Sequence, residues 1–503
     1  MKRAITFALL MVVWVSLCPA GWEMFYGGSD KEVGYCVRQA SDGGYIIAGY
    51  TETFGAGEPD FYLIRTLPTG DTLWTRAFGG VEYDYAYSVC EAADSAFVVC
   101  GYTNSFDNFN DIYIVKTKYD GDTLWTRTIG GSFHDYAYSI YETSDSGYII
   151  CGSTQSFGHG ASDIYLVKTK SNGDTVWTKT FGGSQNEYGY SAVQTADGGY
   201  IVCGYTMSFG AGEFDIYLIK TSATGDTLWT KTYGGSGQDF GQSVTQATDG
   251  GYIICGSTNS FGAGEYDIYL VKISSDGDLL WTQTFGGTGE EFGRSLYATP
   301  DGGCILCGST MSFGAGDEDV YIIKTDSTGE ASWTNTYGGT RKDGVYSVVQ
   351  TSDGGYIMSG TTTSFGAGSY DVYLLKTDSL GSVEGVWEDV DRPEYVSLKA
   401  YPTPFNSAIT LELCGVGATY RSPEQIAVEI FDISGRLVYA PSPTVPLPKG
   451  EGGETLLPPG EGGSKSRMRA FIWQPDESIA SGVYLVRAAI GDRSVTKRIV
   501  YLK

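Results

Sequence analysis

The sequence predicts an all-β protein: a seven-bladed β-propeller of four-stranded blades followed by a small C-terminal β-sandwich. Three observations support this prediction. The chain of 503 residues contains 71 glycines and 38 tyrosines, a composition that favours short strands and tight turns over helices. A tryptophan recurs at spacings of 51 or 52 residues, and this repeat stops before residue 383. The remaining residues follow a different strand pattern.

The first 20 residues predict a secretory signal peptide. Lys2 and Arg3 precede a largely apolar run from Phe7 to Leu17, and Cys18-Pro19-Ala20 offers a cleavage site. Cleavage there would leave Gly21 at the N-terminus. No later stretch approaches 18 apolar residues, so we expect no transmembrane segment in the mature chain.

Residues 21–382 contain seven copies of one unit, and each copy is marked by a tryptophan. These residues are Trp22, Trp74, Trp125, Trp177, Trp229, Trp281 and Trp333. The fourth unit shows four strand-like runs, WTKTF, SAVQT, GYIVCGYT and DIYLIKT, separated by turn signals such as Asp197-Gly198. A unit of about fifty residues with four strands has the size of one propeller blade.

The phase of the repeat favours a closed ring over a linear solenoid, which would need distinct capping repeats. The chain begins with a lone tryptophan strand at Trp22, and its last unit ends on Tyr370 to Thr377 without one. We therefore expect the first strand to complete the seventh blade. Trp387 is followed by EDVDRPEY, which breaks the pattern and rules out an eighth unit.

The segment KTDSTGEASW, from Lys324 to Trp333, is similar to the Asp-x-x-Thr-Gly-x-x-x-Trp docking motif of quinoprotein propellers. The resemblance implies that each tryptophan lies on the outermost strand and packs between blades. Asp326 departs from the motif, because it stands one residue closer to Thr328-Gly329. No signature of a quinone site accompanies the motif, so the resemblance bears on architecture alone.

Two sets of acidic residues recur in loops that this architecture places on one face. The fourth residue after each Gly-Gly is acidic: Glu32, Asp84, Asp135, Glu187, Asp239, Glu291 and Asp343. A second acid opens each third strand: Asp60, Asp111, Asp163, Asp215, Asp267, Asp319 and Asp371.

These acids have two interpretations. Together with neighbouring tyrosines they could form a ligand rim that binds a cation, with calcium as the candidate, or a carbohydrate. Alternatively, the carboxylates cap backbone N–H groups in tight loops. Repetition in every unit favours capping. We therefore expect ligand specificity at residues that break the repeat, namely Gln242, Arg294, Arg341 and Lys342.

Five cysteines fill one slot of the second strand: Cys100, Cys151, Cys203, Cys255 and Cys307. Equivalent strands of neighbouring blades pack about 10 Å apart, beyond the Cα separation of about 7 Å that a disulfide spans. We predict free thiols. Cys304 forms a C-x-x-C sequence with Cys307, but it occupies a position that is tyrosine in most units, so we interpret the motif as coincidental.

The sequence offers few catalytic constellations. His134 and His159 are the only histidines, and there is no G-x-S-x-G nucleophile elbow. We name no catalytic residues. The enzyme alternative is an extracellular polysaccharide hydrolase or lyase that uses loop carboxylates, because glycosidases can work with acidic residues alone.

The charge distribution argues against nucleic acid as a partner. The net charge is −26, and residues 396–503 hold 12 basic and 10 acidic side chains, so the negative charge belongs to the preceding residues. Phosphate binding needs a basic footprint, which these residues lack. Cations and neutral polar ligands, such as a glycan or surface polysaccharide, remain compatible with this charge.

The repeat is lost over residues 383–395, which we predict to be a linker. Residues 396–503 show alternating apolar residues that predict a small β-sandwich. A stretch rich in proline and glycine, at about residues 440–469, fits no strand pattern and predicts a flexible insertion.

The last hundred or so residues resemble the type A C-terminal sorting domain of the type IX secretion system. The matching residues are Tyr401, Pro402, Pro404, Phe405 and Asn406 in the opening, Asp432, Gly435 and Arg436 in a turn, and Gly482 and Tyr484 in a strand. Thr403 departs from the family pattern.

This resemblance implies that the type IX machinery is a partner. The protein would be secreted or placed on the outer-membrane surface of a diderm bacterium, with the sorting domain cleaved. The sequence thus predicts a secreted or cell-surface binding or scaffold propeller.

Overall fold

The computed structural model describes residues 21–106, 109–383, 395–401, 409–416, 426–432, 437–439, 466–473, 481–490 and 493–501. The chain divides into two compact units, Met1–Glu384 and Gly385–Lys503. The predicted signal peptide at 1–20, nearly all of the predicted linker and most of the predicted insertion lie outside the described residues.

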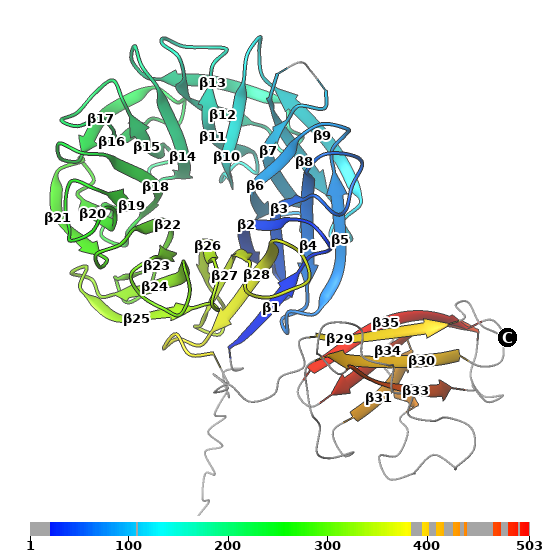
Figure 1. Cartoon of the computed structure of the whole chain (residues 1–503). Helices are drawn as coiled ribbons and strands as arrows, with labels where there is room; N and C mark the ends of the chain where they lie inside the picture. The colour runs from blue at the N-terminus through cyan, green and yellow to red at the C-terminus, as the bar shows by residue number, and fades with distance from the viewer. Residues whose placement is uncertain are drawn as a thin grey trace, which may run out of the picture. The chain divides into compact units, whose positions relative to one another are not determined.

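The first unit is a ring of seven four-stranded antiparallel sheets, each forming one blade (Figure 1). Blade one contains β2 to β5, and the count follows the chain. This confirms the predicted all-β propeller. The innermost strands are β2 (Glu32–Gln39), β6 (Asp84–Glu91), β10 (Asp135–Glu142), β14 (Glu187–Gln194), β18 (Asp239–Gln246), β22 (Glu291–Ala298) and β26 (Asp343–Gln350).

The second strands are β3 (Tyr45–Thr51), β7 (Phe97–Thr103), β11 (Tyr148–Thr154), β15 (Tyr200–Thr206), β19 (Tyr252–Thr258), β23 (Cys304–Thr310) and β27 (Tyr356–Thr362). The third strands are β4 (Asp60–Thr66), β8 (Asp111–Thr117), β12 (Asp163–Thr169), β16 (Asp215–Thr221), β20 (Asp267–Ile273), β24 (Asp319–Thr325) and β28 (Asp371–Thr377). The outermost strands are β5 (Thr72–Phe78), β9 (Thr123–Ile129), β13 (Thr175–Phe181), β17 (Thr227–Tyr233), β21 (Leu279–Phe285), β25 (Ala331–Tyr337) and β1 (Trp22–Tyr26).

The N-terminal strand closes the ring, as the phase of the repeat predicted. β1 pairs antiparallel with β28, from Trp22 opposite Lys376 to Tyr26 opposite Val372. Blade seven therefore takes three strands from the last repeat and one from the start of the described chain. This pairing covers the outer edge of β28, and closing the ring by radial packing leaves only short strand edges exposed.

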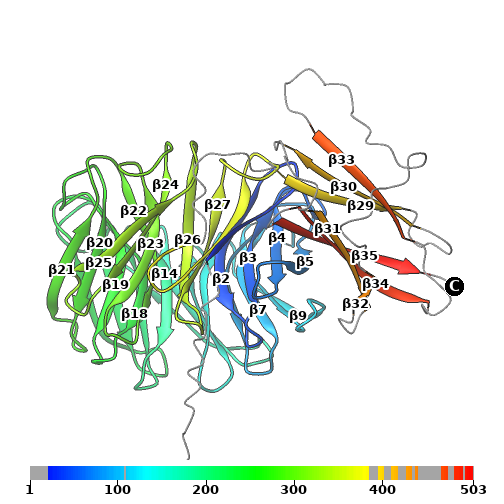
Figure 2. The same ribbon diagram turned by 90° about the horizontal axis from the view of Figure 1, so that it is seen from below.

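The hydrophobic core lies between the blades. Each third strand is apolar on both faces, and β12 shows why. Its residues Ile164 and Leu166 pack into the cluster shared with blade four, whereas Tyr165 and Val167 pack into the cluster shared with blade two. Successive side chains of a strand point to opposite faces, so a continuously apolar strand packs against the blades on both sides of its own blade. Figure 2 shows the blades edge-on, with their strands running between the two faces of the ring.

The repeated tryptophans hold neighbouring blades together. Each lies on an outermost strand and contacts a glycine in the turn that follows the third strand of the next blade. Gly329 has φ +86°, and a Cβ at this position would stand 2.6 Å from the ring of Trp281. Only glycine fits both the backbone conformation and the close approach. The inter-blade packing implied by the tryptophan motif is confirmed.

The five cysteines of the second strands are buried free thiols, as predicted. Cys304 and Cys307 are also free, and they belong to different core clusters on opposite faces of β23. Because they point away from one another, the C-x-x-C sequence forms neither a disulfide nor a metal site.

The second unit contains two antiparallel sheets. One has the order β29 (Tyr395–Tyr401), β30 (Ile409–Val416), β33 (Ser466–Trp473), and the other the order β32 (Leu437–Tyr439), β31 (Ile426–Asp432), β34 (Gly482–Ile490), β35 (Arg493–Tyr501).

Four residues of the predicted sorting motif fall on these strands: Tyr401 ends β29, Asp432 ends β31, Gly482 begins β34, and Tyr484 is buried in β34. The others, Pro402, Pro404, Phe405, Asn406, Gly435 and Arg436, lie outside the described residues. The β-sandwich and the sorting role stay predictions. Across the described segments of both units, no helix is long and apolar enough to cross a bilayer.

Candidate functional site

The first set of acids lies at the start of the innermost strands, where the side chains are fully or almost fully buried. Glu187 is representative. Its Oε2 accepts a hydrogen bond from the Gly183 N–H at 2.7 Å, and its Oε1 accepts one from the Thr206 hydroxyl at 2.7 Å. The matching glycine N–H donates to the acid in all seven units. The carboxylates therefore bind their own loops.

Three of these acids keep one acceptor without a partner. Asp is one methylene shorter than Glu, and Oδ1 of Asp84, Asp135 and Asp239 is buried with no hydrogen-bond partner in the structure. A buried carboxylate oxygen without a donor is costly unless a proton or cation binds it. In the described parts of the chain, however, no three His, Cys, Asp or Glu side chains gather around one point as metal ligands. Calcium binding stays a prediction.

The second set of acids meets the first between neighbouring blades. A Cβ placed on Gly182 would lie 2.1 Å from Asp163 Oδ1 and 2.4 Å from Glu187 Oε2, so the two carboxylates approach one point. Burial, followed by the charge of Glu187, raises the pKa of Asp163 to about 6, although the His159 N–H opposes this shift by donating to Asp163. Burial likewise raises the pKa of Asp60, Asp215, Asp319 and Asp371.

A second ring of side chains, closer to the propeller axis, comes from a β-bulge in each innermost strand. The pairing with the second strand shifts by one residue in every blade, for example between Gly34 and Cys36. The extra residue has no partner on the second strand, and the bulge turns its side chain toward the propeller axis. The seven bulge residues, called the axial ring from here on, are Tyr35, Tyr87, Tyr138, Tyr190, Gln242, Arg294 and Tyr346.

The tyrosines of the axial ring touch from blade to blade. The ring centroids of Tyr35 and Tyr87 lie 4.8 Å apart, those of Tyr87 and Tyr138 5.2 Å apart, and those of Tyr138 and Tyr190 5.1 Å apart. Tyr346 continues the arc, 5.0 Å from Tyr35. All seven axial side chains are half-buried. Burial raises the pKa of each of these tyrosines, so their hydroxyls stay protonated at neutral pH.

Arg294 and Gln242 break the symmetry of the axial ring. The Arg294 Cζ lies 5.3 Å from the centroid of Phe292 and 5.9 Å from that of Tyr346, so the guanidinium rests against aromatic faces. It makes no ion pair with any residue that the structure describes. An arginine without a carboxylate partner stands out in a chain of net charge −26. Its five N–H donors are available to an acceptor on a ligand.

The other candidate residues and the two histidines lie outside the axial ring. Arg341 and Lys342 are exposed on the loop that precedes β26. Nδ1 of His134 accepts a hydrogen bond from the Asn110 N–H at 3.2 Å, and His159 contributes its backbone N–H to Asp163. Neither histidine is placed as a catalytic base beside a nucleophile.

Gln242 and Arg294 were predicted from the sequence, but the five tyrosines of the axial ring were not. The available signal was a tyrosine three residues after the loop acid in most units. Strict alternation along a strand would not have directed these residues to the axis, because only the bulge changes their direction.

The fold and the axial ring define a closed seven-bladed propeller. No family model matches the chain. Regulatory protein FlaEY of Caulobacter vibrioides is 25% identical over 44% of this chain, and the match spans 28% of that protein's length.

Three solved structures illustrate how distant the structural similarities are. The β-propeller domain of the Trilobed protease from Pyrococcus furiosus has 10% identity, with a TM-score of 0.38 over 74% of this chain and 99% of its own. A Glu150Asp mutant of the Synechocystis apocarotenoid oxygenase has 11% identity, with a TM-score of 0.34 over 62% and 73%. A bifunctional GH43-CE protein from Bacteroides eggerthii has 12% identity, with a TM-score of 0.27 over 73% and 52%.

Proposed function

We propose that the protein is a secreted or cell-surface binding or scaffold propeller whose ligand contacts Arg294 and Gln242 of the axial ring. The break in symmetry carries this proposal. A side chain that is repeated in every blade serves the fold. One arginine and one glutamine among five tyrosines instead make one part of the axial ring chemically different from the rest. Rigid scaffolds commonly bind ligands through such singular polar groups at the rim or the axis.

The chemistry of the axial ring suits a glycan. Aromatic rings offer flat apolar faces with polar tips, and the tyrosine hydroxyls, the Gln242 amide and the Arg294 guanidinium can all donate hydrogen bonds to sugar oxygens. A sugar ring presents the matching combination of C–H faces and hydroxyl groups. A surface polysaccharide or other glycan is therefore the ligand class that we propose.

A glycan array followed by titration calorimetry tests this proposal. We expect the purified chain to bind a subset of glycans, and we expect Arg294→Gln to weaken that binding by about tenfold or more, the effect of losing one or two charge-assisted hydrogen bonds. Arg341→Gln is the matched control, because Arg341 is an exposed arginine outside the ring. Equal loss in both variants, or no effect of either, would remove Arg294 from the binding site.

We further propose export through the type IX machinery, with residues 396–503 as the sorting domain and a diderm cell surface or the medium as the destination. The support is the sequence resemblance together with a propeller that is closed within residues 21–377 and needs no strand from the second unit. Deleting residues 396–503 and fractionating the cells tests it. A truncated propeller that still reaches the medium would refute the sorting role.

The enzyme alternative, a polysaccharide hydrolase or lyase, rests on the paired loop carboxylates. Asp163, with its pKa of about 6, beside Glu187 is the pair best suited to proton transfer near neutral pH. If this pair is catalytic, Asp163→Asn abolishes the release of reducing or unsaturated ends from a glycan that the protein binds. Turnover that survives this substitution would exclude the pair.

A further inference from the structure

A cavity lies between blades five and six, on the face of the ring that carries the turns between the first and second strands, called the hairpin side from here on. No residue of the axial ring lines it. Its volume is about 170 Å³, and Lys272, Trp281, Cys304 and Ser327 are among the residues that line it. The other blade junctions show what normally fills this place, because the sequence repeats around the ring.

At most junctions an aromatic ring opens the second strand and packs on the tryptophan of the preceding blade. Centroid distances are 5.9 Å for Trp22 and Tyr45 and 6.2 Å for Trp229 and Tyr252. Trp74 with Phe97, Trp177 with Tyr200 and Trp333 with Tyr356 repeat the arrangement at 5.8 to 6.3 Å. The rings supplied by the second strands are at most 2% exposed.

The same place holds a buried cation, and at two junctions this cation donates a hydrogen bond to a tyrosine hydroxyl. The cation comes from the third strand of the preceding blade and pairs with that blade's hairpin aspartate. At the junction of blades two and three, Lys116 Nζ lies 2.7 Å from Asp94 Oδ2 and donates to the Tyr148 hydroxyl at 3.2 Å. The Lys116 ammonium also lies 5.9 Å from the centroid of the Tyr148 ring.

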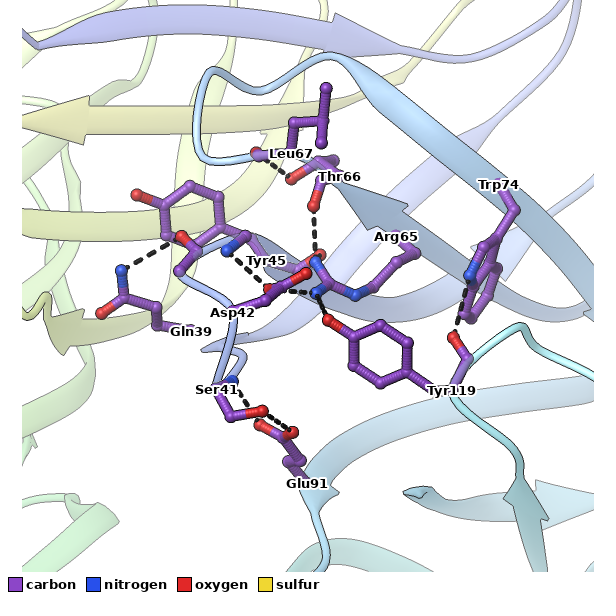
Figure 3. A network of polar contacts seen from close by, with 12 residues as sticks. Gln39, Ser41, Asp42, Tyr45, Arg65, Thr66, Leu67, Trp74, Glu91 and Tyr119 are labelled. Atoms are coloured by element: carbon purple, nitrogen blue, oxygen red, sulfur yellow. Dashed lines mark hydrogen bonds and ion pairs between the residues drawn. The ribbon is translucent and has the colours of Figure 1, made fainter. Parts of the chain in front are cut away.

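The junction of blades one and two obtains its hydroxyl in another way. Phe97 supplies the aromatic ring without a hydroxyl, and Tyr119, from the turn after β8, supplies the hydroxyl. Its oxygen accepts a hydrogen bond from Arg65 Nη2 at 2.7 Å, and its ring stacks on Phe97 at 5.6 Å. Figure 3 shows Tyr119 directed at Arg65, which also contacts Asp42. A phenol beside the cation is thus supplied either by the second strand or by the turn.

The junction of blades five and six has neither source. The residue equivalent to Tyr148 is Cys304, and the residue equivalent to Tyr119 is Ser327. The cation and the tryptophan are still present: Lys272 Nζ lies 2.7 Å from Asp249 Oδ1, and Trp281 lines the cavity. Thr248, Asp326 and Ser327, which are exposed, border the cavity and give access from solvent.

We propose that this cavity binds a small phenol, whose ring packs on Trp281 and whose hydroxyl takes the place beside Lys272 that a tyrosine hydroxyl takes beside Lys116 and beside Arg65. An apolar cavity of about 150 Å³ is large enough to bind benzene, so a cavity of about 170 Å³ accommodates one aromatic ring. The site is separate from the proposed glycan site. Its ligand is either a free phenolic compound or the tyrosine side chain of a partner polypeptide, since both present the same group.

The Cys304 thiol lines this cavity as an uncharged group. Burial raises the pKa of Cys304 to about 11, and its Sγ lies 3.2 Å from Thr325 Oγ1. A thiol that stays protonated is a poor nucleophile. The binding is therefore reversible and leaves the cysteine unmodified.

Titration of the full chain with 4-methylphenol, followed by calorimetry and saturation-transfer NMR, tests the proposal. We expect one site with a dissociation constant below about 1 mM, reasonable for a ligand of about eight non-hydrogen atoms. Toluene, which lacks the hydroxyl, is expected to bind about fivefold more weakly. A Gly-Tyr-Gly peptide amide distinguishes the sources: binding by the peptide indicates a partner tyrosine, and binding by 4-methylphenol alone indicates a free phenol.

Two substitutions fill the cavity in the ways that the other junctions do. Cys304→Tyr restores the ring on the second strand, and Ser327→Tyr supplies it from the turn as Tyr119 does. Each is expected to weaken 4-methylphenol binding by about tenfold or more, and either one suffices if the other fails to fold. Cys307→Ala, on the opposite face of β23, is the control and should change the affinity by less than about twofold. No binding to the unmodified chain at about 10 mM, or full binding in the filled variants, would overturn the proposal.

Discussion

Replacing Cys304 by tyrosine should stabilise the propeller. At about 24 cal/mol per Å³ of cavity, the void of about 170 Å³ at this junction destabilises the fold by at most about 4 kcal/mol. Fixing the new side chain and filling the void incompletely offset part of that gain. We therefore expect Cys304→Tyr to raise the free energy of unfolding by about 1 to 2 kcal/mol.

The reciprocal substitution at the neighbouring blade provides the matched comparison. Tyr252 occupies the same strand position as Cys304, is 2% exposed and packs on Trp229. Tyr252→Cys should create the void that blade six already has, and lower the free energy of unfolding by about 3 kcal/mol.

Urea denaturation of both variants, monitored by far-UV circular dichroism, measures the two changes in the free energy of unfolding. The comparison holds if the dependence of that free energy on urea concentration is the same in both variants. A decrease in stability for Cys304→Tyr, with the expected decrease for Tyr252→Cys, would show that the cavity cannot accept the ring and would refute the reasoning.

Three further predictions follow from the contacts of the ring. Because the pKa of Asp163 is raised to about 6 in the folded state, its contribution to stability is full below pH about 4 and is lost as the pH rises through about 6; urea titrations should show this trend vanish in Asp163→Asn. Although burial opposes it, hydrogen bonds from Lys220 and Thr195 lower the pKa of Asp197 to about 2. Because the Asp197 side chain is 59% exposed and water screens its pair with Lys220, Asp197→Asn should cost at most about 1 kcal/mol at pH 7, and this cost should shrink as the pH falls through about 2 in the same assay. Removing residues 21–26 deletes β1 and opens blade seven, which should expose β28 and produce soluble oligomers in light scattering; a fully monomeric truncated chain would contradict this.

Much of the fold followed from residues that repeat. The tryptophan spacing predicted the size of a blade. The lone strand at Trp22 predicted how the ring closes, because the last repeat lacks a tryptophan strand and the first strand of the chain can supply it. The buried cysteines were also predictable, since Ala48 and Ser359 replace them in the same slot and point to a small buried residue. The sorting motif of the second unit stays a prediction, because only a part of it lies on described strands.

The site was predictable only in part. Comparing units isolated Gln242 and Arg294, but nothing in the sequence marked their position at the axis, because a bulge is a property of the pairing with the next strand. The loop acids were recognised as a repeated set with two interpretations. Their burial, and the hydrogen bonds from glycine N–H groups, depend on how each loop folds back on its own blade.

The sequence by itself determined the units, their strands and the way the ring closes, since these depend on local patterning and on chain connectivity. The tertiary structure decided which side chains meet between blades. The cavity beside Trp281 exists because Cys304 and Ser327, which lie in different strands and turns, both lack a ring at one junction. Such a void depends on the packing of side chains from two blades, and packing is a property of the assembled ring.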